Sequence, residues 1–166
     1  YKKKLKMTKQ EIKDELKETE GRPEVRAQIR RKQREMSMGR MMDAVADADV
    51  IITNPEHFSV ALAYDPSRDS APTVIAKGGD LVALAIREKA SDASVPLFAS
   101  PLLARALYFT TEVNESVPES LYYAVAQVIA YVFSLSTFEA GGQGISRPNP
   151  EIPGDLRFDS NGNLQS

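Results

Sequence analysis

Four short stretches between residues 50 and 99 have the apolar pattern of β-strands. The first stretch is a β-branched run. In the second, Phe58, Val60, Leu62 and Tyr64 alternate with small residues, which predicts a strand with one side in a core. The four predicted strands are Val50–Thr53, Phe58–Tyr64, Thr73–Lys77 and Val95–Ala99.

A helical period governs most of the remaining chain up to about residue 138. It predicts helices from Pro23 to about Ala48, from Asp80, from Ser100 to about Tyr108 and from Pro118. Gly21-Arg22-Pro23 is expected to interrupt the charged N-terminal segment, and Asp80 is expected to cap its helix. The element order predicts an α/β fold: a small four-stranded mixed sheet surrounded by about four helices and preceded by a long basic N-terminal linker helix.

The composition changes after Phe138, where glycine and proline become frequent and periodic apolar residues end. Such a composition predicts a disordered tail. The sequence therefore predicts three parts, which are a basic helical linker over residues 1–42, a globular domain over residues 43–138 and a disordered tail over residues 139–166.

Residues 121–138 form an uncharged stretch of 18 residues, near the lower limit of about 17 residues for a membrane-spanning helix. Gln127, Ser134 and Ser136 within it favour a buried helix of a soluble domain instead. The N-terminal Tyr1-Lys2-Lys3-Lys4 is not followed by the apolar region of a signal peptide.

The formal net charge of −2 hides a division between the two ends of the chain. Residues 1–42 hold 14 Lys and Arg against 7 Asp and Glu, whereas residues 43–166 hold 7 against 16. This asymmetry indicates a basic arm joined to an acidic globular part. The arm is expected to face phospholipid, nucleic acid or an acidic protein, or to be only a solvated helical linker.

The chain has no cysteine and one histidine, His57. The absence of cysteine excludes disulfides, thiolate catalysis and cysteine-based zinc sites. A catalytic triad or a multi-histidine metal site needs more histidine partners than the chain offers. Neither a metal nor a cofactor is expected.

The most informative local chemistry is at Asn54-Pro55-Glu56-His57, between the first two predicted strands. Asparagine usually deamidates when the next backbone N–H attacks its side chain, but Pro55 has no N–H. The remaining route is chain cleavage, in which the Asn54 side-chain nitrogen attacks the Asn54 carbonyl carbon and expels Pro55. A turn that holds these atoms together supplies about 7–11 kcal/mol of the barrier.

His57 is the expected proton handler, since an imidazole titrates near neutral pH. Glu56 is expected either to assist His57 or to be a solvated turn residue. An ordinary proline turn between two strands is the alternative explanation of the same four residues. The second pair, Asn149-Pro150 in the predicted tail, shows that the dipeptide alone carries little weight.

Several separate stretches resemble the cytoplasmic part of the FlhB/YscU/SpaS family of type III export switch proteins, and together they span roughly residues 2–135. The Asn54 stretch, Val50-Ile51-Ile52-Thr53-Asn54-Pro55-Glu56-His57-Phe58-Ser59-Val60-Ala61-Leu62, is similar to the signature around the family's self-cleavage site. The other similar stretches are residues 7–15 with 20–23, then 71–78, 86–88, 101–108 and 121–126.

The resemblance implies cleavage between Asn54 and Pro55 in a single turnover, so the chain is not expected to be an enzyme acting on other molecules. It also implies that the two pieces stay associated. The implied function is a switch of export specificity from rod and hook subunits to filament subunits. An apolar surface at Ala71, Pro72, Ala126 and Ile129 is the implied docking site for export substrates, although plain core packing explains Ala126 and Ile129 equally well.

Transmembrane helices preceding Tyr1 are implied as well, which locates the chain at the cytoplasmic face of the bacterial inner membrane. The implied partners are a hook-length control protein, export-gate subunits of the FlhA type, and export substrates with their chaperones; nucleic acid is not among them. One residue departs from the family pattern, which normally has Thr at the position of Glu56. The alternative function is a basic-arm adaptor that binds lipid or nucleic acid and whose Asn54 turn is inert.

Overall fold

A computed structural model describes the backbone of residues 9–55, 57–67, 70–139 and 146–165, and the side chains of residues 22–55, 57–67, 70–136 and 146–165. The chain divides into two compact units, Tyr1–Arg40 and Met41–Ser166.

The second unit is built on a four-stranded sheet of strands β1 (Val50–Asn54), β2 (Phe58–Ala63), β3 (Thr73–Gly79) and β4 (Leu97–Ala99). The strand order is β3-β2-β1-β4. β2 pairs with β1 and with β3 in antiparallel fashion, whereas β4 pairs parallel to β1. The predicted mixed sheet of four strands is therefore confirmed, with strand ends that differ from the prediction by no more than two residues.

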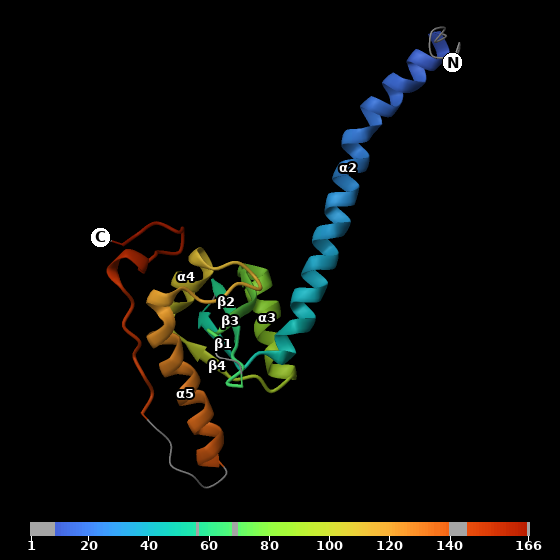
Figure 1. The fold of residues 1–166 in the computed structure, drawn as a ribbon. Coiled ribbons are helices and arrows are strands. Elements are labelled where there is room, and N and C mark those ends of the chain that lie inside the picture. Colours follow the sequence, from blue (N-terminus) through green and yellow to red (C-terminus); the bar gives the residue numbers. More distant parts are fainter. Residues whose placement is uncertain (1–8, 56, 68–69, 140–145, 166) are drawn as a thin grey trace. The chain divides into compact units, whose positions relative to one another are not determined.

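Helices cover both faces of the sheet. α3 (Asp80–Asp92) packs on one face, and α4 (Pro101–Thr110) and α5 (Tyr122–Glu139) pack on the other (Figure 1). Three short 3-10 helices, η1 (Val45–Asp47), η2 (Glu119–Leu121) and η3 (Gly154–Leu156), complete the described elements of this unit.

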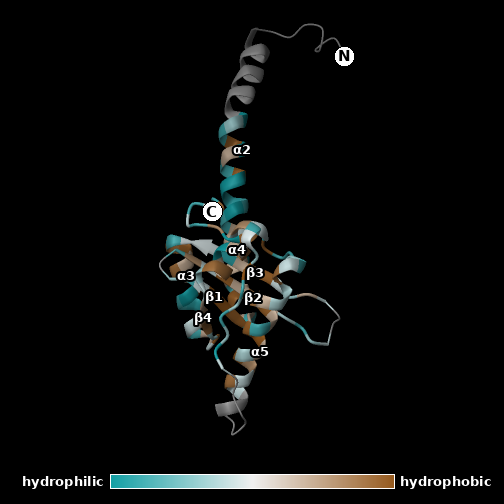
Figure 2. Ribbon diagram, turned by 90° about the vertical axis from the view of Figure 1, so that its left-hand side faces the viewer, coloured by the Kyte–Doolittle hydropathy of each residue, from teal (hydrophilic) through white to brown (hydrophobic). Residues whose placement is uncertain are grey.

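The period-2 pattern of the strands divides the core into two layers. Val50 and Ile52 pack toward α4 and α5, and Ile51 between them packs toward α3. All five residues of β1 are buried, because the strand is central and has helices on both sides. Figure 2 shows this apolar centre of the sheet in brown.

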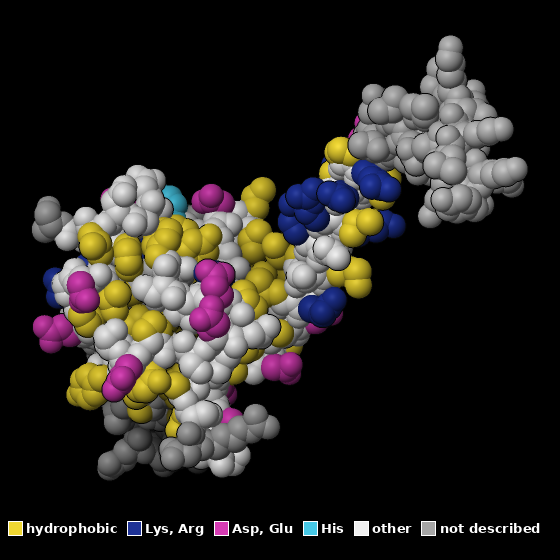
Figure 3. Space-filling view, turned by 45° about the horizontal axis from the view of Figure 1, so that its top comes forward, with side chains coloured by type: hydrophobic (Ala, Val, Ile, Leu, Met, Phe, Trp, Pro, Cys, Tyr) yellow, Lys and Arg dark blue, Asp and Glu magenta, His cyan; other side chains and the backbone are white. Residues whose placement is uncertain are grey.

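The N-terminal helix differs from its prediction. α2 (Lys9–Ala44) runs without interruption through Pro23, where the sequence predicted a break. Proline removes one backbone donor from a helix, which weakens or kinks the helix without forcing it to end. Seven Lys and Arg and two Glu lie between residues 22 and 40, all exposed, and Figure 3 shows the basic side chains gathered on this helix.

The C-terminal segment also differs from its prediction. Residues 146–165 were expected to belong to a disordered tail, but they pack against the domain. Ile152 is 1% exposed and belongs to the core between the sheet, α4 and α5. Side chains that are far apart in the sequence hold this segment to the domain. Its apolar residues therefore do not recur with the period of a helix or a strand. Residues 140–145 of the predicted tail lie outside the described residues.

Candidate functional site

Asn54 and His57 close a tight turn that joins β1 to β2. Asn54 is the last residue of β1 and pairs directly with Phe58, the first residue of β2. The His57 N–H donates a hydrogen bond of 3.0 Å to the Asn54 carbonyl oxygen, which closes the turn. Pro55 is exposed at the second position of this turn, where its fixed φ is favoured. The turn thus fixes the one carbonyl group that the proposed cleavage attacks.

The Asn54 side chain is buried at the end of the strand, with 6% of the residue exposed. Within the part of the chain that the structure describes, its Nδ2 atom is buried and has no hydrogen-bond partner. A buried amide donor without a partner costs free energy, about 1–3 kcal/mol, so such a group is rare unless it has another role. The side-chain nitrogen is therefore not held away from the Asn54 carbonyl by a described competing bond.

His57 is the last residue of the turn, and 53% of its side chain is exposed. Its ring centroid is 6.3 Å from that of Phe58, and its Nδ1 is 3.9 Å from Oδ1 of Asp80. Asp80 is a site residue that the sequence analysis missed, since it is far from the turn in sequence. The antiparallel pairing of β2 with β3 brings Asp80 to the turn, because it sets Phe58 opposite Gly79.

Two further parts of the sequence bear on this site, and they are Glu56 and the second Asn-Pro pair. Glu56 lies outside the described residues. The comparison pair, Asn149-Pro150, lies in a segment without regular secondary structure, where Asn149 is exposed. Only the first Asn-Pro pair is thus held between two paired strands.

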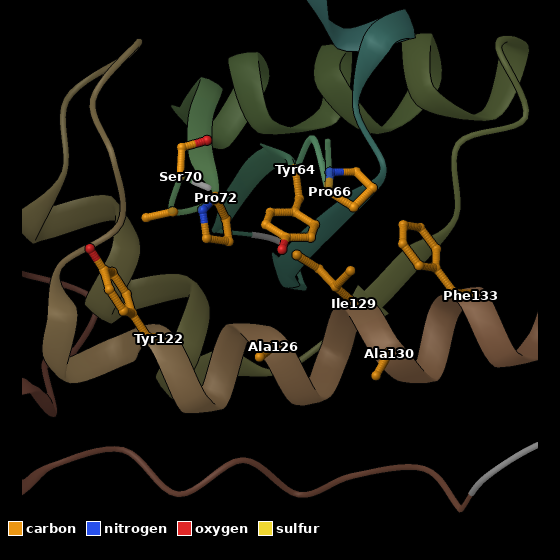
Figure 4. A pocket seen from close by; sticks show the side chains of 10 residues that line it. Tyr64, Pro66, Ser70, Pro72, Tyr122, Ala126, Ile129, Ala130 and Phe133 are labelled. Atoms are coloured by element: carbon orange, nitrogen blue, oxygen red, sulfur yellow. The ribbon is translucent and has the colours of Figure 1, made fainter. Parts of the chain in front are cut away.

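The four residues expected to form a docking surface lie together. Ala71 and Pro72 precede β3, Ala126 and Ile129 lie on α5, and all four line one hollow with a volume of about 640 Å³. We call this the apolar hollow, and Figure 4 shows it between α5 and the segment before β3. Its other lining residues are Tyr64, Pro66, Ser70, Tyr122, Ala130 and Phe133.

Ala126 and Ile129 were each open to two interpretations, docking surface or core packing, and their burial distinguishes these. Ile129 is 5% exposed and belongs to the core, whereas Ala126 is exposed. The neighbouring Tyr122 and Phe133 are 42% and 43% exposed, which leaves aromatic surface at the rim of the hollow. Concave apolar surfaces of this kind are typical of binding sites.

No group of His, Asp and Glu among the described residues is arranged to hold a metal ion. No helix in the described part of the chain combines the length and apolar character needed to cross a membrane.

Comparison with known proteins gives consistent matches. Residues 1–132 match the model of the FlhB HrpN YscU SpaS family. The flagellar biosynthetic protein FlhB of Salmonella typhimurium is 49% identical over 158 residues, which are 94% of this chain and 41% of that protein. The chain therefore spans less than half the length of this relative.

Solved structures match as well. The cytoplasmic domain of FlhB from Shewanella putrefaciens has a TM-score of 0.68 at 47% identity, covering 73% of this chain and 95% of that one. A mutated EscU C-terminal domain has a TM-score of 0.53 at 30% identity, covering 55% of this chain and 91% of that one.

Proposed function

The chain belongs to the FlhB HrpN YscU SpaS family of the flagellar export apparatus, and from this premise we propose that it is a self-cleaving switch domain. Cleavage between Asn54 and Pro55 prepares the apparatus to change its export specificity from rod and hook subunits to filament subunits. The protein acts once on its own backbone and not on external substrates. The observation that carries this proposal is the buried Asn54 amide nitrogen, which has no hydrogen-bond partner among the described residues.

In the proposed reaction, Asn54 Nδ2 attacks the Asn54 carbonyl carbon, forms a new C–N bond and gives up a proton. The bond from that carbon to the Pro55 nitrogen breaks, the Pro55 nitrogen takes up a proton, and a succinimide remains at Asn54. Negative charge that develops on the Asn54 carbonyl oxygen is stabilised by the His57 N–H, which already donates to it at 3.0 Å. The His57 imidazole is the group of the turn best suited to move the protons.

Glu56 stands where the family normally has Thr. Bond making and bond breaking use atoms of Asn54 and Pro55, so Glu56 in place of the usual Thr is compatible with cleavage. We therefore expect Glu56→Thr to cleave as the unsubstituted chain does.

We further propose that the apolar hollow receives export substrates. Its small residues, Ala71, Pro72 and Ala126, leave room for an inserted apolar side chain, and Tyr122 and Phe133 extend the surface along α5. The hook-length control protein, gate subunits and chaperones are the other proposed partners. The basic residues of α2 favour a location beside the anionic cytoplasmic face of the inner membrane.

Mass spectrometry of the denatured protein tests the cleavage. We expect two species, residues 1–54 and residues 55–166, in place of the intact chain. Asn54→Ala removes the attacking nitrogen and is expected to leave one intact species. Asn149→Ala is the matched control and is expected to cleave as the unsubstituted chain does. A single intact mass after prolonged incubation at neutral pH contradicts the proposal.

A further inference from the structure

His57 is held by its backbone from both sides. Its N–H donates to the Asn54 carbonyl oxygen at 3.0 Å, and its own carbonyl oxygen accepts a hydrogen bond of 2.8 Å from the Asp80 N–H. The second bond lies just beyond the last pair of the β2–β3 ladder, Phe58 with Gly79. Asp80 therefore fixes the peptide unit that follows the donor of the turn.

The backbone of Asp80 is unusual. Its φ is +49°, in the left-handed region that residues other than glycine rarely adopt. Such a conformation persists where surrounding contacts hold it, and it is frequent at functional sites. The bond to His57 is one contact of that kind, since it requires the Asp80 N–H to point at the turn.

The sequence predicts that the Asp80 side chain caps α3, and this prediction is wrong. Gly79 is the N-cap residue of α3, and α3 has no side-chain capping hydrogen bond. The Asp80 carboxylate lies instead 3.9 Å from His57 Nδ1. At this distance the contact is not a hydrogen bond, but the carboxylate attracts the imidazole whenever the ring is charged. Both side chains are more than half exposed, so the attraction is modest and acts on the orientation of the ring.

We propose that Asp80 is a positioning residue for cleavage at Asn54-Pro55. Its N–H holds the His57 carbonyl oxygen and so fixes the peptide unit after His57, which helps to keep the His57 N–H directed at the carbonyl under attack. Its carboxylate keeps the His57 ring beside the turn, where the leaving Pro55 nitrogen needs a proton. This inference rests on the proposed self-cleavage.

Three substitutions separate the two contributions. Asp80→Asn keeps the shape and removes the charge, and Asp80→Gly removes the side chain while glycine accepts the positive φ freely. Asp80→Ala removes the side chain and also opposes the left-handed backbone. Glu88→Gln is the matched control, because it removes an exposed carboxylate from the same helix.

The first readout is the time course of cleavage after cell-free synthesis, followed by denaturing electrophoresis. We expect Asp80→Asn and Asp80→Gly to slow cleavage about three- to fivefold, the size of a weak exposed ion pair. Asp80→Ala is expected to slow it about tenfold, because the bond to His57 is loosened as well. Asp80→Glu is expected to restore part of the rate, and Glu88→Gln to leave it unchanged.

The second readout is the NMR signal of the imidazole, which is unambiguous because the chain has one histidine. It is measured in the Asn54→Ala protein, which is expected to stay intact. Asp80→Asn is expected to move the ring resonances of His57, and Glu88→Gln is not. A merely structural role of Asp80 at the start of α3 would leave these resonances in place.

The outcomes separate this inference from the proposed function. Unchanged cleavage in both Asp80→Asn and Asp80→Gly, in a chain that otherwise cleaves, overturns the role of Asp80 alone. Unmoved His57 resonances in Asp80→Asn overturn the contact between the two side chains. An unsubstituted chain that never cleaves overturns the self-cleavage, and with it the role of Asp80 even where the His57 resonances still respond.

Discussion

At Gly78, the absence of a side chain allows β3 to lead directly into α3. A Cβ placed on Gly78 would lie 2.2 Å from Cγ1 of Val82 and 2.7 Å from its Cβ. Neither atom is the end of a long flexible side chain, so the helix itself has to move. The Asp80 N–H, which donates to the His57 carbonyl oxygen, lies only two residues after Gly78. A shift of the chain at Gly78 is therefore expected to displace this hydrogen bond as well.

We therefore expect Gly78→Ala to lower the free energy of unfolding by about 1–3 kcal/mol, the usual cost of overpacking. Gly154→Ala is the matched control, because an added Cβ meets no atom within 4 Å. Urea denaturation followed by circular dichroism measures both. Equal stability of the two variants would contradict the close approach of Val82.

At the scale of elements, the C-terminal segment is held by side chains at several separate points. The Arg147 guanidinium lies 4.2 Å from the centroid of the Phe98 ring and donates to the carbonyl oxygen of Ala99 in β4 at 2.6 Å. Nearer the end, the Arg105 side chain donates to the Phe158 carbonyl oxygen at 2.5 Å. The segment thus braces an edge strand of the sheet and α4.

This packing predicts a measurable difference between two apolar residues of the segment. Ile152→Ala is expected to lower the free energy of unfolding by about 2–5 kcal/mol, because Ile152 is 1% exposed. Leu164→Ala is expected to change it little, because Leu164 is 57% exposed. Thermal and urea denaturation distinguish the two. A disordered segment would make both substitutions neutral.

The face of α5 toward the apolar hollow gives a second prediction at this scale. Ala126→Glu places a charge in the hollow and is expected to weaken binding of hook-type export subunits at least tenfold. The fold should tolerate the substitution, because Ala126 is exposed. Tyr123→Glu adds the same charge to the same helix at a residue that is 76% exposed and does not line the hollow. Calorimetric titration compares the two; equal affinities would exclude the hollow as the docking surface.

At the scale of the whole molecule, the proposed cleavage leaves β1 and the other three strands on different pieces. β1 pairs with β2 on one side and with β4 on the other, and all five of its residues are buried. The Ser100 N–H also donates to the Thr53 carbonyl oxygen at 2.9 Å, directly beside the cleavage site. None of these contacts depends on the bond between Asn54 and Pro55 that the proposed cleavage breaks.

We therefore expect the two pieces to elute together from a size-exclusion column in native buffer and to separate in concentrated urea. The burial of apolar surface by β1 supports this association without a covalent link. The Asn54→Ala chain, run beside it, is expected to elute at the same native volume. Separate elution of the two pieces in native buffer would contradict the prediction.

Some of the fold was readable from short stretches of sequence. The four strands follow from β-branched and alternating residues, and the turn at Asn54-Pro55 follows from proline chemistry between two such runs. The predicted break at Pro23 was wrong, because one missing donor is a small local effect in a helix of 36 residues. The predicted disorder of the tail is contradicted over residues 146–165, where Ile152 is buried. The sequence did not reveal this packing, because isolated contacts leave no periodic pattern.

The sequence by itself determined the strands, most of the helices, the charge division and the chemistry available to Asn54. These properties depend on each residue and its near neighbours along the chain. The tertiary structure decided which distant residues share a site: it set Asp80 beside His57, brought Ala71 and Pro72 to α5, and seated the C-terminal segment. Those contacts depend on strand register and on packing between elements, which local patterns do not encode.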